Sequence, residues 1–563
     1  MYQSLLDAIN TVVVQTMDFS GDFSLEHPKE LSHGDYMTNI ALVAGKQGGK
    51  NPVELAKTLV EALEQKKIHG IEKIEVAGPG FINFTLRRDV FVNELATAQD
   101  PEWGNTEVYK GQKILIEHSS PNLFKPFHIG HLMNNTVGEA LYRLAKSSGA
   151  QATPISFPSD ISLGVAKAVY VLLETYGEDF TPTDVSVLGD AYVEGVRKYK
   201  EGEEEQPCGS IVYRVKEIAD NLYAKKDSPE LRLFEKCKAV NIAYFESIVA
   251  SLGSVFDSYI YESEAGEEGK KIVLENTPKV FTESEGAIVY IPAEDRKDIN
   301  TSVFINSQGN PTYEAKDIGL IALKFEKYNP DLSIYITDNQ QMEHFKVVFD
   351  AMSHINEPWA TKSIHRYHGR MSFKGAKMSS RLGNVPTVEG MLAAVVEEVK
   401  EKNPDVSEEV AKQVAIAAIK FSILRTQTGK DINFDPDTSL SFEGDSGPYL
   451  QYTAVRAGSL LEKGKTLGIA PNVDTPVSGT ETLERLTPRF IEVCAEAQKA
   501  WAPHYVVTYL LELAQAFNSW YGQGKIIDED VSATAYRLSI VAAARQTLIN
   551  GLWVLGIDVP EKM

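Results

Sequence analysis

Two histidines three residues apart, in His128-Ile-Gly-His131, have the spacing best suited to chemistry in this chain. At the start of a helix, residues three apart share one face, so both imidazoles can reach the same group, and Gly130 leaves room for a flat ring. A helix N-terminus also attracts anions through its unpaired backbone N–H groups and its dipole. Lys125, just upstream, adds a positive charge. This combination predicts a site for the phosphates of a nucleotide.

The residues on either side of this pair predict the elements that must position it. Residues 113–116 form a short apolar run, and apolar side chains recur downstream at Met133, Val137, Leu141 and Leu144. This pattern predicts a strand, a loop and then an amphipathic helix, with the histidines at the helix N-terminus. Taken alone, however, two histidines at this spacing are more often a satisfied or solvated pair than a catalytic one.

A second stretch, Lys377-Met-Ser-Ser-Arg381, also has the composition of a phosphate-binding loop. By itself it would be an ordinary loop. Together, His-Ile-Gly-His and Lys-Met-Ser-Ser-Arg resemble the paired signatures of class I aminoacyl-tRNA synthetases. The longer stretch that ends at His131, Ser-Ser-Pro-Asn-Leu-Phe-Lys-Pro-Phe-His-Ile-Gly-His, is similar to that of the arginyl-tRNA synthetases in particular.

The resemblance implies an arginine–tRNA ligase. Such an enzyme activates L-arginine with ATP to arginyl-adenylate and transfers it to the 3′-terminal adenosine of tRNA(Arg), releasing AMP and pyrophosphate. Neither step needs a covalent enzyme intermediate, so positioning and stabilisation of charge on the phosphates would lower the barrier. The implied partners are L-arginine, tRNA(Arg) and ATP, which would bring Mg²⁺ with it. The resemblance also implies that arginine activation waits for tRNA.

The resemblance assigns residues to the ATP chemistry. The implied ATP-binding residues are His128, Gly130, His131, Lys377, Ser379 and Ser380, and the implied catalytic residues are His128, His131, Lys377 and Lys125. Ser380 stands where the common Lys-Met-Ser-Lys-Ser form has its second lysine, so one cationic contact is missing. We expect Lys125 or Arg381 to supply that charge.

Recognition of arginine needs carboxylates, because a planar guanidinium bonds two oxygens at once. Asp317 is the leading candidate, since Tyr313 and Asp317 resemble the family's Thr-Tyr-x-x-x-Asp-Ile motif and, four apart on a helix, can face one pocket. Without the resemblance, Asp317 would be interpreted as a helix cap. The arginine-binding residues that the resemblance implies are Ser120, Asn122, Tyr313, Asp317, Gln341 and Glu285, with Glu117 a weaker candidate.

Alternating strand and helix signals from about residue 106 predict a multidomain α/β protein with a Rossmann-type parallel sheet. The expected domains are a small N-terminal α+β domain at 1–105, a catalytic domain at 106–390 and a C-terminal helical domain at 391–563. A largely helical, acidic insertion is expected near 165–255. Strand signals at 287–291, 301–305 and 333–337 are assigned to the returning sheet.

The two outer domains resemble the tRNA-contacting parts of the same family. The stretches His33-Gly-Asp-Tyr-Met-Thr-Asn39 and Gly78-Pro-Gly-Phe-Ile-Asn83 are similar to an N-terminal extension that contacts the outer corner of tRNA. The helical domain resembles the anticodon-binding domain, in which Tyr449, Arg456 and Trp553 are candidate tRNA-binding residues. Aromatic rings near an arginine can stack on unpaired bases, but Tyr449 and Trp553 could equally be core residues.

Composition narrows the class of protein. The chain has 563 residues, of which 43% are hydrophobic and 24% charged, a balance typical of a globular protein with several domains. Its net charge of −22 argues against a general nucleic-acid binder, so basic side chains must gather on one face if tRNA is a partner. The three cysteines are widely separated and predict neither a zinc site nor a disulfide framework.

Two features of the sequence bear on its location. No apolar run reaches the roughly 18 residues of a membrane span, and the N-terminal residues lack the pattern of a secretion signal. We therefore expect a cytoplasmic protein without membrane contact, and we expect it to be a monomer.

Two other classes of protein share some of these features. A small-molecule nucleotidyl or pantothenate-type ligase carries the histidine motif on the same fold, but such chains are usually shorter and lack a large helical C-terminal domain. A non-catalytic tRNA-binding relative is the other alternative, but a pure binding role would not require His128, Gly130, His131 and Lys377.

Overall fold

The computed structural model describes residues 1–17, 19, 21–205, 210–374 and 387–563. The chain forms two compact units. Unit 1 consists of residues 1–104, 453–493 and 509–550, and unit 2 of residues 105–452, 494–508 and 551–563. The expected three-domain division by sequence order stays a prediction.

A five-stranded parallel sheet lies at the centre of unit 2, in the strand order β12-β11-β5-β6-β7. Its strands are β5 (Lys113–Glu117), β6 (Gln151–Ser156), β7 (Ser258–Tyr259), β11 (Leu332–Asp338) and β12 (Ser363–His368). The order reverses at β5, which pairs with β6 on one side and β11 on the other. Ligands of such sheets bind beyond the carboxyl ends of the strands at this reversal. The predicted multidomain α/β fold with a Rossmann-type sheet is confirmed.

The helices that accompany this sheet carry most of the predicted site. They are α5 (Ile129–Ser147), α10 (Glu262–Glu275), α11 (Tyr313–Tyr328), α12 (Met342–Ile355) and α13 (Glu357–Thr361). Helices α10 and α11 cross at backbone contact, because a Cβ added at Gly319 would lie 1.9 Å from the carbonyl oxygen of Ala265. This close crossing fixes α11, the helix of Tyr313 and Asp317, on its neighbour.

Two of the three strand signals assigned to the returning sheet belong elsewhere. Strands β8 (Phe281–Ser284), β9 (Ala287–Tyr290) and β10 (Ser302–Ile305) form a separate antiparallel sheet in the order β10-β9-β8. Glu285 and Gly286, with φ of 49° and 79°, make the two-residue turn between β8 and β9. Such a turn joins strands only as an antiparallel hairpin, so the assignment of residues 287–291 and 301–305 to the parallel sheet was wrong.

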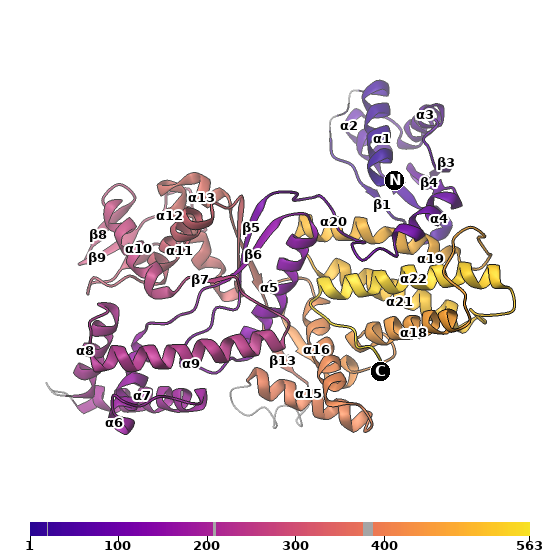
Figure 1. Cartoon of the computed structure of the whole chain (residues 1–563). Helices are drawn as coiled ribbons and strands as arrows, with labels where there is room; N and C mark the ends of the chain where they lie inside the picture. The colour runs from indigo at the N-terminus through magenta and orange to yellow at the C-terminus, as the bar shows by residue number, and fades with distance from the viewer. Residues whose placement is uncertain (18, 20, 206–209, 375–386) are drawn as a thin grey trace. The chain divides into compact units, whose positions relative to one another are not determined.

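The expected helical insertion lies between β6 and β7. It consists of α6 (Leu163–Tyr176), α7 (Val185–Glu205), α8 (Ile211–Tyr223) and α9 (Pro229–Ser251), which gather around their own apolar core (Figure 1). Core side chains from all four helices, among them Val169, Leu188, Ile218 and Phe234, are at most 1% exposed. The insertion is therefore a packed subdomain of unit 2.

Beyond residue 387 the described chain is almost entirely helical, as expected. Its helices are α15 (Val388–Lys402), α16 (Glu408–Leu424), α17 (Pro436–Ser439), α18 (Gly447–Thr466), α19 (Glu481–Leu486), α20 (Phe490–Ala500), α21 (His504–Gly522) and α22 (Val531–Val554). One short strand interrupts them: β14 (Ile432–Phe434) pairs in parallel with β13 (Met371–Phe373). Among the helices that the structure describes, none has the length and apolar character needed to cross a bilayer.

In unit 1 the first hundred residues form a four-stranded antiparallel sheet with helices. The strands, in the order β1-β2-β4-β3, are β1 (Leu25–Glu26), β2 (Tyr36–Thr38), β3 (Ile71–Ala77) and β4 (Phe81–Leu86), and the helices are α1 (Tyr2–Thr16), α2 (Ile40–Gly48), α3 (Pro52–Gln65) and α4 (Arg88–Thr97).

The Gly-Asp-Tyr stretch holds unit 1 together internally. The Asp35 carboxylate accepts a hydrogen bond from the Leu86 N–H at 2.7 Å and lies 3.3 Å from Arg485 of α19. The Tyr36 hydroxyl donates to Glu492 of α20, and Asp35 and Tyr36 are buried. These side chains therefore pack the small sheet against helices from the C-terminal part of the chain.

Candidate active site

The predicted histidine pair sits at the start of α5, directly beyond the carboxyl end of β5. His128 is the N-cap residue, and its Nδ1 accepts the Gly130 N–H at 3.1 Å. In return, the Nδ1 of His131 accepts the His128 N–H at 3.3 Å. The two rings stack, with centroids 3.9 Å apart and an interplanar angle of 15°. The structure therefore brings both imidazoles together at the helix N-terminus, as their spacing predicts.

These hydrogen bonds fix which nitrogen of each neutral ring carries the proton. Because both Nδ1 atoms accept, each Nε2 carries a hydrogen and can donate. Burial lowers the pKa of His128, and the charge of Lys125 lowers it further. Burial lowers the pKa of His131 well below its ordinary value. Near neutral pH the pair therefore offers two neutral Nε2–H donors at the positive end of the α5 dipole.

The loop that precedes the pair is held from both sides. Ser119 and Phe124 have positive φ values of 56° and 64°, a backbone conformation that persists only where surrounding contacts impose it. The Ser119 N–H donates to the Asn134 side chain of α5 at 2.6 Å, and the Phe124 N–H donates to Asn241 of α9 at 3.1 Å. The insertion thus anchors the loop that carries Lys125. Sequence spacing gave no signal for Asn241.

The second predicted motif, with Lys377, Ser379, Ser380 and Arg381, lies outside the described residues. The first residue described after them, Thr387, forms an antiparallel backbone bridge with His128, and the Val388 N–H donates to the Phe127 carbonyl at 2.9 Å. The chain that follows the Lys-Met-Ser-Ser-Arg stretch therefore runs directly beside the histidine pair.

Asp317 lies in the second turn of α11, where it forms an ion pair. Thr312 is the N-cap of this helix, so Asp317 is not the cap that spacing alone would suggest. Its Oδ2 lies 2.5 Å from the Nε2 of His344 on α12, and the His344 Nδ1 lies 3.9 Å from Glu314. Burial pulls the pKa of His344 down, but its hydrogen bonds to the two carboxylates outweigh this effect and raise it to about 9. His344 is a site residue that sequence reasoning missed.

Glu117, at the end of β5, is paired with a lysine in the core. The Lys324 ammonium contacts the Glu117 carboxylate and lies 3.4 Å from the centroid of the Tyr335 ring. Burial raises the pKa of Glu117 and lowers that of Lys324, while their mutual attraction opposes both shifts. The Asp317 charge raises the pKa of Glu117 further. Asp317 lies two turns before Lys324 on the same face of α11, so each of the two carboxylates has a cation of the protein as its partner.

Replacement of Lys324 by methionine should destabilise unit 2 strongly. The Lys324 side chain is fully buried, so its removal leaves the Glu117 carboxylate in the core without a counter-charge. Breaking such a pair typically costs ~3–5 kcal/mol. Urea unfolding followed by fluorescence should show the loss. The double variant Lys324→Met with Glu117→Gln should recover most of it, and an equal loss in both variants would show that packing, and not charge, is responsible.

The other residues predicted for arginine are placed unevenly around this pair. Tyr313 opens α11 one turn before Asp317, and Gln341 ends the short 3-10 helix η2 (Asn339–Gln341) after β11. Ser120 follows β5, and its hydroxyl accepts the Phe157 N–H at 3.1 Å. Asn122 forms a backbone bridge with Ser159. These four residues lie in segments that follow β5 and β11 or that begin the helix of Asp317.

Glu285 is the exception. It lies in the exposed hairpin turn between β8 and β9 of the separate antiparallel sheet, and its role as a second guanidinium contact stays a prediction. Glu117, the weaker candidate, contacts Lys324 on the same helix as Asp317.

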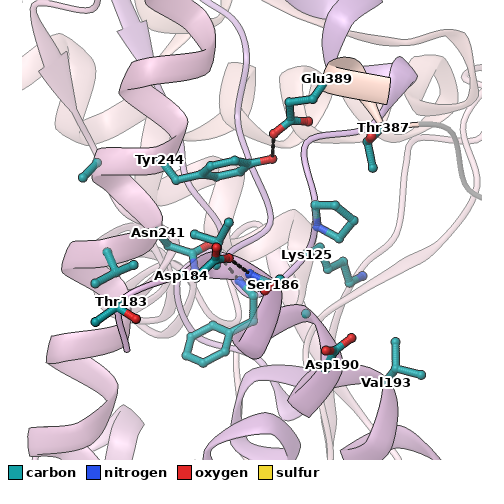
Figure 2. Close-up of a pocket in the computed structure, with 16 residues that line it drawn as sticks. Lys125, Thr183, Asp184, Ser186, Asp190, Val193, Asn241, Tyr244, Thr387 and Glu389 are labelled. Atoms are coloured by element: carbon teal, nitrogen blue, oxygen red, sulfur yellow. Dashed lines mark hydrogen bonds between the residues drawn. The ribbon is translucent and has the colours of Figure 1, made fainter. Parts of the chain in front are cut away.

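A cavity of about 900 Å³ opens beside the loop before the histidines (Figure 2). It lies between α7 and α9 of the insertion, the stretch Phe124 to Pro126 and the start of α15. Tyr244 of α9 donates a hydrogen bond to Glu389 of α15 across it (Figure 2). Of the predicted site residues that the structure describes, Lys125 alone lines this cavity. The cavity therefore adjoins the histidine site, and the arginine candidates lie apart from it.

The three predicted tRNA-binding residues differ in accessibility. Tyr449 is only 8% exposed, which favours the core alternative over stacking on a base, and its role in tRNA binding stays a prediction. Arg456 donates to Asn518 at 2.5 Å and packs on the Tyr521 ring in unit 1. Trp553 in unit 2 is 36% exposed, and the Arg143 guanidinium lies 5.3 Å from its ring centroid.

Three parts of the chain match protein families. Residues 95–435 match the family described as "tRNA synthetases class I (R), catalytic domain", residues 450–563 the "DALR anticodon binding domain" and residues 3–86 the "Arginyl tRNA synthetase N terminal domain". The first match spans more than half of the chain and contains the parallel sheet and the histidine pair. The fold and the site together define a class I aminoacyl-tRNA synthetase.

Relatives over the full length narrow this class. The chain is 30% identical to an arginine–tRNA ligase of Clostridium perfringens, with 96% of both chains covered, and 29% identical to one of Borreliella burgdorferi, with 91% of both covered. The chain belongs to the arginyl-tRNA synthetase family.

Solved structures agree with this assignment. An arginyl-tRNA synthetase of Thermus thermophilus is similar with a TM-score of 0.81 at 26% identity, and the similarity covers 100% of both chains. An arginyl-tRNA synthetase of Plasmodium falciparum has the same TM-score at 19% identity, covers 100% of this chain and 98% of its own, and supports the fold alone.

Proposed function

We propose that this protein activates L-arginine with ATP and transfers the arginyl group to the 3′-terminal adenosine of tRNA(Arg). One observation supports this proposal above the others. Two neutral Nε2–H donors stand at a helix start beyond β5, and Glu117 at the end of β5 contacts Lys324 on the same helix as Asp317. A triphosphate needs the first arrangement and a guanidinium the second.

Each group has a defined task in the first step. The Nε2–H groups of His128 and His131 donate to the phosphate oxygens of ATP, and the flat adenine approaches over Gly130. Asp317 and Glu117 hold the guanidinium, while Ser120 and Asn122 hold the amino-acid backbone, with its carboxylate aimed at the α-phosphorus. Attack of that carboxylate forms arginyl-adenylate and expels pyrophosphate. Tyr313 and Gln341 complete the wall around the arginine side chain.

Lys377, Ser379 and Ser380 would bind the pyrophosphate. The backbone bridge between Thr387 and His128 supports this, because Thr387, the first described residue after the motif, lies beside the histidine pair. Mg²⁺ would arrive with ATP and bind mainly through phosphate oxygens, as this ion commonly does. Among the described residues, no three His, Cys, Asp or Glu side chains cluster in a way that could hold a metal ion.

Lys125 or Arg381 should replace the missing second lysine of the Lys-Met-Ser-Lys-Ser form. Lys125 is exposed three residues before His128, and its ammonium lies 5.0 Å from the centroid of the Tyr192 ring. We expect the double variant Lys125→Ala with Arg381→Ala to lower the rate of ATP–pyrophosphate exchange by about 10²-fold, the range found when a charge-stabilising donor is removed. The matched control is Lys146→Ala, an exposed lysine at the far end of α5. Equal rates for the double variant and the wild type would refute the compensation.

The aminoacylation assay tests the proposed function itself. Purified protein, ATP, Mg²⁺, total tRNA and radiolabelled arginine should give acid-precipitable label together with AMP. The same reaction with labelled lysine, which has a cation but no planar fork, should give none. Failure to charge tRNA with arginine would refute the proposal and favour a non-catalytic relative.

The finer statements about partners are also proposals. The match to an anticodon-binding domain and the partly exposed Trp553 support tRNA contact by the C-terminal helices. We propose a monomer that works in the cytoplasm. Light scattering coupled to size-exclusion chromatography should give the mass of one chain, 62.2 kDa.

A further inference from the structure

The carboxylates assigned to the guanidinium are themselves backed by cations of the protein. His344 contacts Asp317 through Nε2 at 2.5 Å and faces Glu314 through Nδ1 at 3.9 Å. Lys324 contacts Glu117. With His344 protonated, three carboxylates stand against two cations, which leaves one net negative charge. A bound guanidinium would bring a second positive charge against Asp317, which already faces the His344 cation.

His344 is largely buried and is contacted by several neighbouring side chains. Its own side chain is 15% exposed and that of Asp317 is 13% exposed. The Phe345 ring meets the imidazole edge-on, at a centroid distance of 5.4 Å. On β12, His365 lies within electrostatic reach, but burial lowers its pKa to about 4, so it is neutral. The charged groups that face His344 are therefore Asp317 and Glu314 on α11.

The two nitrogens of His344 have different tasks. The Nε2–H donates to one oxygen of Asp317, which fixes the carboxylate and leaves its other oxygen for a ligand. The Nδ1 proton, opposite Glu314, makes the ring a cation and can leave without breaking the bond to Asp317. A guanidinium that binds Asp317 competes with this cation for the same negative charge.

We infer that His344 is a positioning residue of the arginine pocket, which orients Asp317 through Nε2–H and releases its Nδ1 proton to solvent when a guanidinium binds. This inference rests on the proposed function, because it assumes that Asp317 holds arginine. A residue of α12 would thereby make the affinity for arginine depend on pH.

The sign of the pH dependence follows from linkage. In the empty pocket the pKa of His344 is raised to about 9, so the ring is protonated at neutral pH. A bound guanidinium lowers that pKa, so binding releases a proton at pH values between the lowered value and about 9. Affinity for arginine must then rise with pH in this window and level off above it. The α-amino group of arginine titrates in the same pH range. Its contribution to the pH dependence of KM must therefore be measured in a variant that lacks the His344 proton and then subtracted.

The test compares four proteins by their KM for arginine in aminoacylation between about pH 6.5 and pH 9.5. Glutamine has its amide nitrogen near the position of Nε2, so His344→Gln keeps the donor to Asp317 without a titratable proton. His344→Ala removes both. His354→Ala is the matched control, an exposed histidine ten residues later on the same helix.

We expect the wild type and His354→Ala to show a fall of about tenfold in KM for arginine as pH rises through the window, as expected for one displaced proton over about one pH unit. His344→Gln should lack this fall beyond the part due to the substrate. At about pH 9.5, where the wild-type ring is mostly neutral, His344→Ala should have a KM for arginine about tenfold above that of the wild type with KM for ATP unchanged, and His344→Gln should restore most of that loss. Calorimetry in two buffers of different ionisation enthalpy should show more proton release in the wild type and His354→Ala than in His344→Gln.

The outcomes separate the two claims. Identical pH profiles in the wild type and His344→Gln, or an unchanged KM in His344→Ala, would overturn the role of His344 while arginine charging stands. A wild type that charges no arginine at any pH would refute the proposed function instead.

Discussion

The variant His128→Asn is expected to lower the rate of arginine activation by about 10²–10³-fold, the range found when one donor to developing charge is removed. The asparagine Oδ1 takes the place of Nδ1, so it can still accept the Gly130 N–H that caps α5. Only the Nε2–H donor to phosphate is lost. ATP–pyrophosphate exchange with saturating arginine and tRNA measures the effect.

The design of this variant separates chemistry from folding. Because the cap is kept, the melting temperature should stay within about 2 °C of the wild type, a shift far below that of a lost core contact. His128→Gln has the opposite pattern, since its amide nitrogen lies near Nε2 while the acceptor for Gly130 is gone. It should therefore be less stable but more active than His128→Asn. Wild-type exchange in His128→Asn would show that the imidazole does not contact phosphate.

The variant Asp317→Asn should reduce kcat/KM for arginine by roughly 10²–10⁴-fold. The neutral amide cannot balance the guanidinium, and a desolvated charge without its partner costs ~3–5 kcal/mol, which corresponds to that range. The rate at saturating arginine should fall less than kcat/KM, because the ATP site at the start of α5 is untouched. Glu326→Gln, an exposed change on the same helix, serves as the control.

Citrulline gives a second readout of the same carboxylate. It has the shape of arginine without the charge, so the wild type should reject it strongly, and Asp317→Asn should narrow the ratio of arginine to citrulline turnover by a similar factor. If citrulline and arginine were activated equally by the wild type, the assignment of Asp317 to the guanidinium would be wrong.

The elements around the histidines could be predicted because their signals are local. The apolar run before Glu117, the prolines of the loop and the apolar spacing after His131 all act within a few residues, and the structure has a strand, loop and helix there. The parallel sheet followed from the alternation of strands and helices. Residues 287–291 were misplaced because a short apolar strand carries no mark of its partner, and the Glu285-Gly286 turn that decides the pairing went unnoticed.

The rest of the site depends on contacts between distant segments. Lys324 meets Glu117 across 207 positions of the chain, and Asn241 meets Phe124 across 117. No periodicity links such pairs. Nothing in the sequence therefore distinguishes the buried Lys324 from an exposed lysine. His344 follows Gln341 closely, but its contact with Asp317 exists only because α11 and α12 pack together. The burial of Tyr449 is likewise a property of the fold that its local sequence does not reveal.

The most direct test of the central claim is ATP–pyrophosphate exchange measured with each of the twenty amino acids, with and without total tRNA. We expect arginine to be the only amino acid that supports exchange, and only when tRNA is present. In the Asp317→Asn variant we expect this exchange to be lost. Exchange supported by another amino acid at a comparable rate, or no exchange with any of them when tRNA is present, would contradict the claim that this site joins arginine to ATP.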